Sequence, residues 1–479
     1  MRTFAPHFGH VAIVAWGTFD SNVRSDEKPL GGPKAPCIPP GGTAKYRAPL
    51  PRSGPPMAVR EWLETFRDDV VTIDAPVSRE LEVTRHLLAN PRAPVHFRDL
   101  DGYEGVGGLW ASRARIARAM TIPEEGLLDA VGDSQRHPED VRLVDHADFS
   151  ANESTDFDLR DSPVPKFYPK DAGRYITAGV WVAEWEGKRN LSFHRILLLD
   201  ARRGVARIVP RHLRTMHGQA QAAGQELKVA VCIGLDPWLL IGGGTSVEYG
   251  VDESRIASSL KRRTLGQPVE CVKLKNGLTV PADAEYVLEG RLTGETHDEG
   301  PFVDAVLTYD RVRQEPVVEF ERVYHRQDPI FHMILGGSDE HFNFMGMPRE
   351  PVIRDGVSKV VPRVAGVRLT EGGCAWLHAV VAIEKHTDGD GKNAIMAAFA
   401  SHTSLKHVTV VDADVNVWDD REVEWAVATR FQADRGLVVL TGVRGSSIDP
   451  SAGETTAKMG IDATRPLTAK PEMFLKATL

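Results

Sequence analysis

The stretch YITAGVWVAEWEGKRNLSFHRILLLDARRGVARIV, residues 175–209, decides the fold class of the chain. It contains two long segments rich in β-forming residues, 175–185 and 191–209, joined by the turn-like sequence Glu-Gly-Lys-Arg. Two such segments around a short turn predict antiparallel strands. Similar segments recur downstream with few helices between them, which favours a β-barrel or a sandwich. The further strands are expected over 269–274, 284–292, 302–309 and 317–324, and one helix is expected over 211–222.

The regions on either side of this β-rich centre alternate between helix and strand. After it, we expect a strand over 407–411 and a capped helix over 420–430. Before it, the spacing of apolar residues predicts a helix over 58–67, a strand over 70–73, a helix over 78–90 with Ser78 as its N-cap, and a strand over 94–100.

The length of 479 residues exceeds what one hydrophobic core organises. The change of pattern along the chain therefore predicts three domains: an α/β domain over 57–165, a β-rich domain over 166–345 and a second α/β domain over 346–479. Residues 1–56 differ from all of these, because proline and glycine crowd the segment from Lys28 onward. Such a segment buries too little apolar surface to fold, so we expect a flexible extension, with Met57 as the start of the folded protein.

The composition excludes several classes of function. The formal net charge is -8 and the charged residues are interspersed, so neither nucleic acid nor a membrane surface is an expected partner. The apolar runs are too short to span a bilayer. The four cysteines form no CxxC pair, and Cys232 and Cys271 lie in apolar stretches, as buried thiols do in a reducing compartment. We therefore expect a soluble, cytoplasmic protein.

Polar residues of catalytic type gather in three short clusters, 190–195, 210–214 and 299–304, and a further acidic residue, Glu253, follows the run Gly242 to Gly244. Each has an ordinary structural interpretation when taken alone: a histidine at a helix start often caps it, and Glu-Gly-Pro is usually a turn. The glycine run lacks the spacing of a phosphate loop. Strand alternation also places Asn190, Ser192 and His194 on one face and Arg195 on the other, unless the strand bulges there.

Taken together, these clusters resemble the signature of the UbiD family of decarboxylases, which includes ferulic acid and other aromatic acid decarboxylases. The residues that carry the resemblance are, in order, Asn190-x-Ser192-x-x-Arg195, Pro210-x-His212, Glu253 and Glu299-Gly-Pro-Phe-x-Asp304. The segments 171–177, 280–290, 410–417 and 458–464 also resemble the family's sequence. The likeness runs in order from about Ala58 to the end of the chain.

The resemblance implies a cofactor and a metal site. In the family, a divalent metal, Mn2+ (or Mg2+), holds the phosphate of prenylated flavin mononucleotide (prenylated FMN), and a K+ ion lies nearby. Carried over, Asn190, His212 and Glu253 become the metal ligands, and an amide oxygen, an imidazole and a carboxylate suit such an octahedral site. Ser192, Arg195 and Arg211 are the positions that border the cofactor.

The resemblance also implies a catalytic trio of Arg195, Glu299 and Asp304. An arginine between two carboxylates keeps Glu299 ionised and can hold the substrate carboxylate. Asp304 is the expected proton donor after CO2 leaves, with Glu299 as the alternative. The chain departs from the common pattern at two positions, because many relatives have Glu in place of Asp304 and Gly in place of Val303.

The family's fold and reaction follow as expectations. The fold is an N-terminal α/β domain, a central split β-barrel that binds the flavin, and a C-terminal α/β oligomerisation domain in a homodimer or homohexamer. The reaction is reversible, non-oxidative decarboxylation of a small aromatic or α,β-unsaturated carboxylic acid, with a flavin prenyltransferase supplying the cofactor and the substrate wall among 334–344 and 435–443. Two alternatives stay open: a split-barrel flavin oxidoreductase, and a non-catalytic subunit of a decarboxylase complex.

Overall fold

The computed structural model describes residues 58–474 and 476, and the predicted extension over 1–56, Met57 and Cys37 lie outside the described residues. The centre of the chain forms a nine-stranded sheet in which every paired strand is antiparallel. The strand order is β6-β9-β10-β17-β14-β11-β7-β8, with β5 beside β17. The strands are β5 (Asn152–Ser154), β6 (Tyr175–Ile176), β7 (Val180–Trp185), β8 (Lys188–Phe193), β9 (Ile196–Leu198), β10 (Arg203–Ala206), β11 (Leu227–Ile233), β14 (Tyr286–Glu299) and β17 (Arg313–His325).

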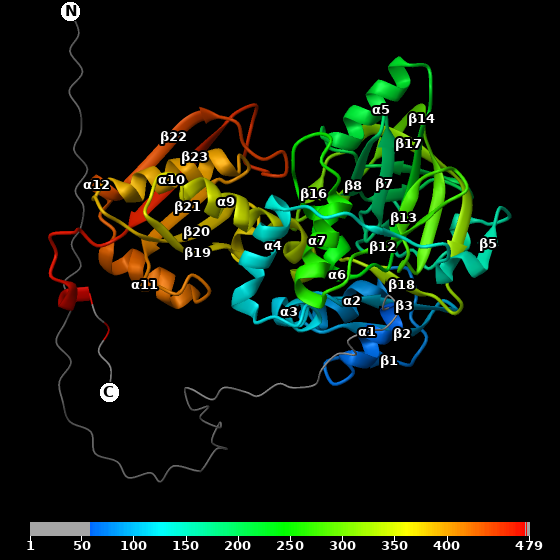
Figure 1. Cartoon of the computed structure of the whole chain (residues 1–479), viewed down its shortest axis with the longest axis horizontal. Helices are drawn as coiled ribbons and strands as arrows, with labels where there is room; N and C mark the ends of the chain where they lie inside the picture. Colours follow the sequence, from blue (N-terminus) through cyan, green and yellow to red (C-terminus); the bar gives the residue numbers. More distant parts are fainter. Residues whose placement is uncertain (1–57, 475, 477–479) are drawn as a thin grey trace, which may run out of the picture. The chain divides into compact units, whose positions relative to one another are not determined.

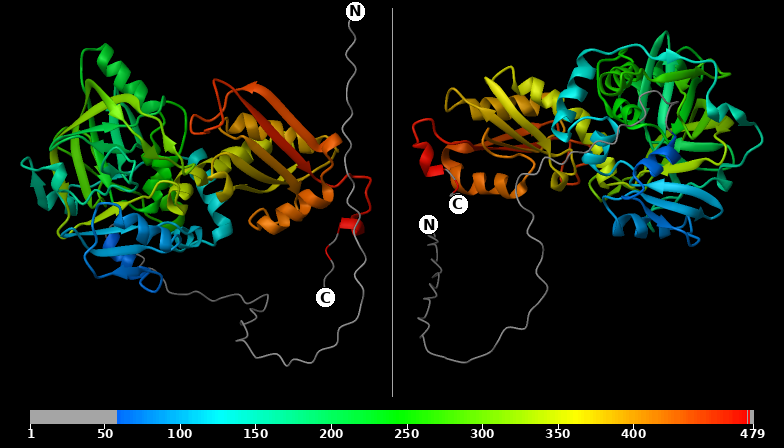
Figure 2. Two further views of the ribbon diagram at one scale, coloured as in Figure 1. Left: turned by 180° about the vertical axis from the view of Figure 1, so that it is seen from behind. Right: turned by 60° about the horizontal axis from the view of Figure 1, so that its bottom comes forward.

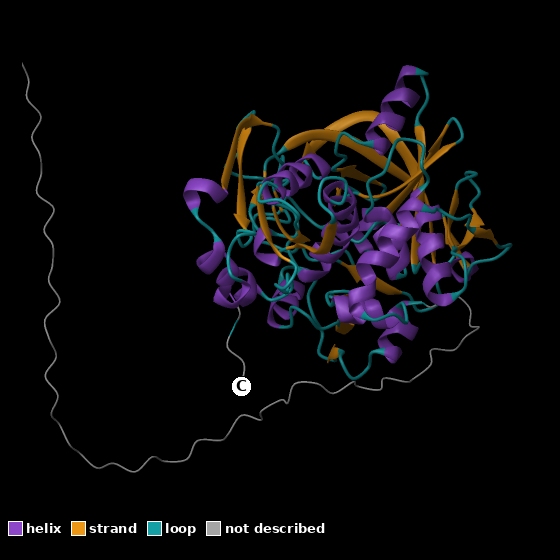
Figure 3. Ribbon diagram, turned by 60° about the vertical axis from the view of Figure 1, so that its left-hand side comes forward, coloured by secondary structure: helices purple, strands orange, loops and turns teal. Residues whose placement is uncertain are grey.

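The order of these strands shows that the sheet closes on itself. β8 is the last strand at one end of the order and β9 is the second strand from the other end, yet only His194 and Arg195 separate them in sequence. Three Cα–Cα steps separate Phe193 from Ile196 and span at most about 11 Å, so the two ends of the sheet must curve toward each other. Figure 3 shows the long strands curving in this way. The result is a split β-barrel, as the sequence predicts.

Both faces of the barrel sheet are buried, which explains its apolar strands. In β7, Val180 and Val182 belong to one hydrophobic core, while Trp181 and Ala183 belong to another. Successive side chains of a strand point to opposite faces, so each face packs against its own core. Helix α5 (His212–Ala222) contributes Leu213, among others, to the second core and matches the predicted helix.

Several local predictions were wrong. Segments 175–185 and 191–209 are not two long strands, because they break into β6 and β7 and into β8, β9 and β10. Ser78 is not an N-cap: helix α2 (Glu82–Ala89) begins after Leu81, and the Ser78 hydroxyl instead accepts a hydrogen bond from the Glu80 amide at 3.1 Å. The run Gly242 to Gly244, for which the sequence indicated no phosphate loop, forms the end of a helix.

Helices also lie between the central strands where few were expected. Helix α6 (Pro237–Gly244) and helix α7 (Glu253–Leu265) separate β11 from β12 (Glu270–Lys273). The expected strand over 269–274 exists as β12, but it belongs to a separate three-stranded sheet with β13 (Thr279–Pro281) and β4 (Arg142–Leu143). Glu253 is therefore the first residue of a helix, and Asp252 caps that helix through the Ser254 amide.

The N-terminal part of the described chain is an α/β layer. Its sheet has the order β1-β2-β3-β18, in which the last strand returns from far along the chain. The elements are α1 (Val59–Thr65), β1 (Val71–Ile73), α2, β2 (Val95–Leu100), β3 (Tyr103–Gly107), α3 (Arg113–Ala119), α4 (Leu127–Arg136) and β18 (Ile330–Met333). The exact division at residues 165 and 345 stays a prediction.

The C-terminal part is a five-stranded sheet between helices, as Figures 1 and 2 show. Its strands are ordered β19-β20-β21-β23-β22. One face packs on α9 and α10, and the other packs on α11, so the strands alternate between two cores. The elements are α8 (Asp339–Gly346), η4 (Met347–Arg349), α9 (Glu350–Val357), β19 (Arg363–Leu369), β20 (His378–Glu384), α10 (Asp390–Ser401), β21 (His407–Asp412), α11 (Asp420–Arg430), α12 (Ala433–Gly436), β22 (Leu437–Val443) and β23 (Thr456–Ala463).

Two further expectations can be compared with the structure. Cys232 and Cys271 are both buried free thiols, as predicted. Within the described part of the chain, the helices are all too short or too polar to cross a membrane.

Candidate active site

Arg195 lies in the short link where the barrel closes. β8 ends at Phe193 and β9 begins at Ile196, so the strict alternation of a strand does not apply to Arg195. The backbone of the link is fixed by two hydrogen bonds: the Trp181 indole donates to the His194 carbonyl at 2.8 Å, and the Arg207 amide donates to the Arg195 carbonyl at 3.0 Å. The closure of the barrel therefore positions the guanidinium.

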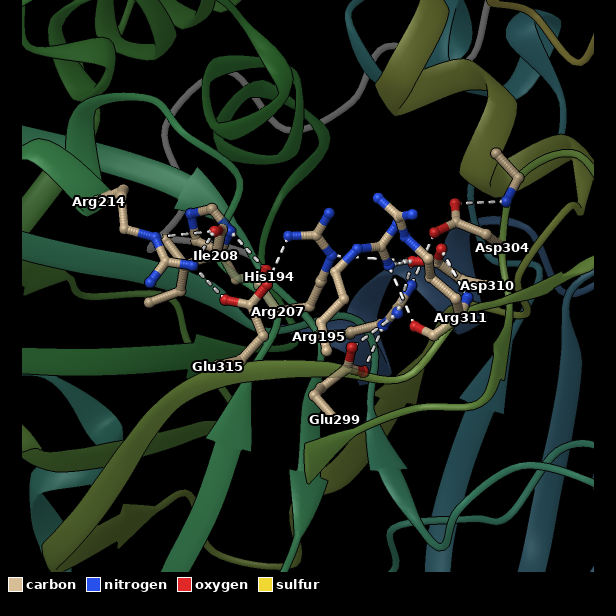
Figure 4. A network of polar contacts seen from close by, with 12 residues as sticks. His194, Arg195, Arg207, Ile208, Arg214, Glu299, Asp304, Asp310, Arg311 and Glu315 are labelled. Atoms are coloured by element: carbon tan, nitrogen blue, oxygen red, sulfur yellow. Dashed lines mark hydrogen bonds and ion pairs between the residues drawn. The ribbon is translucent and has the colours of Figure 1, made fainter. Parts of the chain in front are cut away.

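The three residues predicted to be catalytic meet in one ion cluster (Figure 4). Arg195 donates from Nε and Nη2 to the two oxygens of Glu299 at 2.8 and 2.9 Å, and from Nη1 to Asp304 at 2.7 Å. The Glu299 side chain is fully buried, whereas that of Asp304 keeps 20% of its surface exposed. The guanidinium carbon also lies 4.6 Å from the centre of the Phe302 ring. Of the two carboxylates, Asp304 is the more accessible.

The loop between Glu299 and Asp304 is shaped by local backbone features. Gly300 has a φ of 93°, which favours glycine, and the peptide bond to Pro301 is cis. β15 (Phe302–Val303) then pairs with β16 (Tyr309–Asp310), so the loop returns on itself. This return brings Asp310 back to the site.

Asp310 is a third carboxylate on Arg195 that the sequence did not reveal. It accepts a hydrogen bond from Arg195 Nη2 at 3.2 Å and forms an ion pair with Arg313 at 2.5 Å. Burial opposes its ionisation, but the hydrogen bonds and positive charge of Arg313 and Arg195 outweigh burial, and the pKa of Asp310 is lowered. No sequence motif marks this residue, and only the pairing of β15 with β16 places it.

Electrostatics keep Arg195 charged. Its burial disfavours the cation, yet Glu299, Asp304 and Asp310 together outweigh that cost and raise the pKa of Arg195 above its ordinary value. His194, the preceding residue, has the opposite environment. Burial lowers its pKa to about 3, so it is a neutral side chain at physiological pH.

The three predicted metal ligands also converge. The Asn190 amide donates to Glu253 Oε1 at 3.0 Å, and His212 Nδ1 lies 3.2 Å from the same oxygen. Asn190 is buried on strand β8, and Glu253 is buried at the start of helix α7. His212 is the first residue of α5. The Ser192 hydroxyl donates to Asn190 Oδ1 at 2.9 Å and so joins the group. The structure thus brings together residues separated by more than 60 positions.

This donor set fits a hard divalent cation better than zinc. One amide oxygen, one imidazole nitrogen and one carboxylate leave room for further oxygen ligands in an octahedral arrangement. Among the described residues, no group of three His, Cys, Asp or Glu side chains is arranged to hold a metal. The trio here has an asparagine as its third donor. Amide oxygen and nitrogen differ only by rotation of the side chain, so Asn190 can present its oxygen to a cation.

Two basic side chains complete the surroundings. Arg211, predicted to border the cofactor, donates to the Ser246 hydroxyl just after α6. His341 on α8 accepts a hydrogen bond from the Gly337 amide at 3.1 Å. Burial lowers the pKa of His341, while the charge of Asp304 raises it and the charge of Arg195 lowers it. His341 lies within the predicted substrate wall over 334–344.

Comparison with known proteins identifies the family. Models of the three domains of 3-octaprenyl-4-hydroxybenzoate carboxy-lyase match residues 61–135 (N-terminal domain), 142–339 (Rift-related domain) and 342–463 (C-terminal domain). The chain belongs to the UbiD family. It is therefore a carboxy-lyase with the three-domain UbiD fold, as the sequence resemblance indicates.

Individual UbiD relatives refine this assignment. Anhydromevalonate phosphate decarboxylase of Methanocaldococcus jannaschii is 42% identical over 407 residues, covering 84% of this chain and 95% of that protein. The enzyme of the same name from Aeropyrum pernix is also 42% identical, and the match covers 83% of this chain and 91% of that protein. Gallate decarboxylase of Lactiplantibacillus plantarum is more distant, at 29% identity, and the match covers 76% of this chain and 82% of that protein.

A solved UbiD structure matches nearly the whole described chain. The UbiD-class enzyme HmfF from Pelotomaculum thermopropionicum, in complex with FMN, has a TM-score of 0.85 and 38% identity, covering 88% of this chain and 97% of that one. An evolved dimeric form of the same enzyme, in complex with prFMN, has a TM-score of 0.81 and 35% identity. The structural neighbours of this chain thus include proteins that hold FMN and prenylated FMN.

Proposed function

We propose that this UbiD enzyme uses prenylated FMN to decarboxylate an α,β-unsaturated acid that carries a phosphate group. The observation that carries the reaction is the convergence of Arg195, Glu299 and Asp304. The second trio, Asn190, His212 and Glu253, converges as well, and its Asn190 lies five residues before Arg195 in the chain. The 42% identity to anhydromevalonate phosphate decarboxylases supports the substrate class. The name of these relatives denotes a phosphate ester of an acid that has lost water, which is an unsaturated acid rather than an aromatic one.

The second trio is the proposed cofactor anchor. Asn190, His212 and Glu253 would hold Mn2+ or Mg2+, with a K+ ion nearby, and the metal would hold the phosphate of the flavin. Ser192 and Arg211 would border the same group. When bound, the prenylated flavin supplies an electron sink for the carbon that loses CO2, which no amino-acid side chain supplies.

The protein's own residues would orient the acid and move one proton. Arg195 would pair with the substrate carboxylate, because its guanidinium already binds carboxylates through three of its nitrogens. The surrounding burial excludes water from the carbon that reacts. Asp304 is the proposed proton donor, since its side chain is partly exposed while Glu299 is fully buried and held by two hydrogen bonds.

Partners follow from the same proposal. The cofactor would come from a flavin prenyltransferase, and the protein would act as a homodimer or homohexamer through its C-terminal domain. The chain carries the complete catalytic trio, which supports an active enzyme rather than a non-catalytic subunit. A flavin oxidoreductase would not need either trio.

The test is cofactor analysis of protein co-expressed with a flavin prenyltransferase. We expect prenylated FMN and manganese in near-equal amounts, seen by absorption, mass spectrometry and metal analysis. The His212→Ala variant should lose both together, because the metal links the protein to the phosphate. Plain FMN alone, or prenylated FMN retained fully in the His212→Ala protein, would overturn the assignment of the second trio.

A further inference from the structure

Basic side chains gather without acidic partners at the beginning of the C-terminal part. Arg349, the last residue of η4, has its guanidinium carbon 5.5 Å from the centre of the Trp376 ring. The ring of His402 lies 4.4 Å from that same ring, at an angle of 78°. In the part of the chain that the structure describes, Arg349 forms no ion pair, whereas its neighbour Arg354 pairs with Asp129.

Buried polar atoms in this cluster have no hydrogen-bond partner. Arg349 Nε and His402 Nε2 are both buried and unpaired among the described residues, and only 6% of His402 is exposed. Lys458 is 4% exposed, and its ammonium group donates to the Thr403 carbonyl at 2.6 Å but meets no described carboxylate. A buried donor or charge without a partner is costly, so such atoms indicate a missing ligand.

Burial and nearby positive charges disfavour the charged forms of these basic side chains. Burial, followed by the charge of Arg211, lowers the pKa of Arg349 to about 9. Burial, followed by Arg349 and Arg211, lowers the pKa of His402 to about 3, and burial lowers the pKa of Lys458. Burial is the largest cause of each change, and neighbouring positive charge adds to it at Arg349 and His402. A bound anion would compensate this positive charge.

The cluster is connected to the catalytic centre by one helical segment. His341, whose charge environment includes Asp304 and Arg195, lies on α8, and Arg349 follows eight residues later at the end of η4. Eight residues correspond to about 12 Å of helical rise. Glycines allow the elements to approach closely here, since a Cβ on Gly346 would lie 2.8 Å from the Ala375 carbonyl oxygen. One continuous stretch of chain, from α8 through η4, thus carries both His341 and Arg349.

We propose that Arg349, His402 and Lys458, with Arg211 at one side, bind the phosphate group of the substrate. This inference rests on the proposed function, and it assigns the residues that select a phosphorylated acid. A phosphomonoester carries a charge of about -1.5 to -2 at pH 7 and accepts several hydrogen bonds, and arginine binds it in a bidentate manner. The neutral His402 imidazole can still donate one N–H. The phosphate of the cofactor has its own proposed anchor at Asn190, His212 and Glu253.

The experiment compares binding and turnover in the Arg349→Met enzyme. With anhydromevalonate phosphate, kcat/KM of the enzyme loaded with prenylated FMN should fall by about 100-fold, mainly through KM, as expected when one partner of a buried charge pair is removed. With the dephosphorylated acid, kcat/KM should fall much less, so the preference of the enzyme for the phosphorylated acid should shrink. Calorimetric titration of the phosphorylated acid into the Glu299→Gln protein should give heat of binding, which the added Arg349→Met change should abolish.

Controls separate the possible outcomes. The Arg354→Met protein changes a partnered arginine five residues away, and it should bind as the wild type does; Lys458→Met serves as a second variant of the cluster if Arg349→Met fails to fold. Unchanged binding of the phosphorylated acid in both cluster variants would overturn the proposal. Loss of prenylated FMN from these variants would assign the cluster to the cofactor phosphate and would also overturn it. Binding by calorimetry without CO2 release would refute the proposed function while upholding the phosphate site.

Discussion

Three carboxylates hold the guanidinium of Arg195, and this arrangement fixes its position before any substrate binds. Glu299 accepts from Nε and Nη2, Asp304 accepts from Nη1, and Asp310 shares Nη2 with Glu299. A substrate carboxylate must therefore compete with Asp304 or Asp310 for Arg195. In the proposed mechanism, this competition would free Asp304, whose partly exposed carboxyl group could take up a proton from solvent and give it to the carbon after CO2 departs.

The first prediction concerns Glu299. The Glu299→Gln variant should lower kcat by about 10²- to 10⁴-fold, because the neutral amide no longer fixes Arg195 by charge or exchanges a proton. Its content of prenylated FMN and manganese should match the wild type, as measured by absorption and metal analysis. The adjacent Asp298→Asn variant, which alters an exposed side chain, should keep full activity. Wild-type turnover by Glu299→Gln would contradict the role given to Glu299.

The sequence predicted some of the residues at the site but not others. Arg195, Glu299 and Asp304 stood in motifs that resemble the family, and the structure brings them within hydrogen-bond distance. Asp310 stands in no such motif, and it reaches Arg195 only because β15 and β16 pair. Arg349 was also missed, since a buried cation without a partner is a property of the folded chain rather than of its neighbours in sequence.

Elements position the site through close packing of small residues. α6 ends in Gly242 to Gly244, and a Cβ on Gly244 would lie only 2.1 Å from the Phe344 carbonyl oxygen of α8. Phe344 in turn stacks on Phe193 at 6.4 Å, and Phe193 is the last residue of β8 before the catalytic link. The glycine run is therefore a packing contact that supports the barrel closure.

The second prediction follows from this contact. Gly244→Ala should lower the free energy of unfolding by about 1–3 kcal/mol, because the added methyl forces α6 and α8 apart. It should also reduce retention of prenylated FMN. Urea denaturation and absorption would measure the two effects. As a control, Gly218→Ala adds a methyl on exposed α5 with nothing within 4 Å, and it should be neutral or stabilising by up to about 1 kcal/mol. Equal stability of the two variants would contradict the packing role.

Element types were easier to predict from the sequence than their ends. The sequence predicted α5, α11 and β21 within a few residues. The long segments 175–185 and 191–209 were read as unbroken strands because their β-forming residues continue through the breaks. Closure of the barrel imposes those breaks, and closure depends on pairing with strands far away in sequence.

The third prediction concerns the stability of the whole molecule in acid. Burial, followed by His407, lowers the pKa of His378 to about 4, and burial lowers the pKa of His194 and His402 to about 3. Between pH 6.5 and these values, the unfolded chain binds protons that the folded chain does not. The free energy of unfolding should therefore fall as pH decreases below 6.5, by up to about 1.4 kcal/mol per pH unit for each histidine.

Denaturant unfolding at pH 7, 6 and 5 would measure this slope. The His378→Gln variant should flatten it, since glutamine does not titrate and can hydrogen-bond to Thr370 and Thr409 as His378 does. The exposed His297→Gln variant should leave the slope unchanged. An equal slope in the wild type and in His378→Gln would contradict the assignment of this buried histidine.

Reaction chemistry is the central claim, and CO2 release tests it most directly. The protein is purified from cells with and without a flavin prenyltransferase, and CO2 from anhydromevalonate phosphate is measured against protein concentration. The account predicts sustained CO2 release, with one equivalent of CO2 per acid consumed, only from protein that contains prenylated FMN and metal. Absence of CO2 from fully loaded protein, or equal release from protein with plain FMN or no flavin, would contradict it.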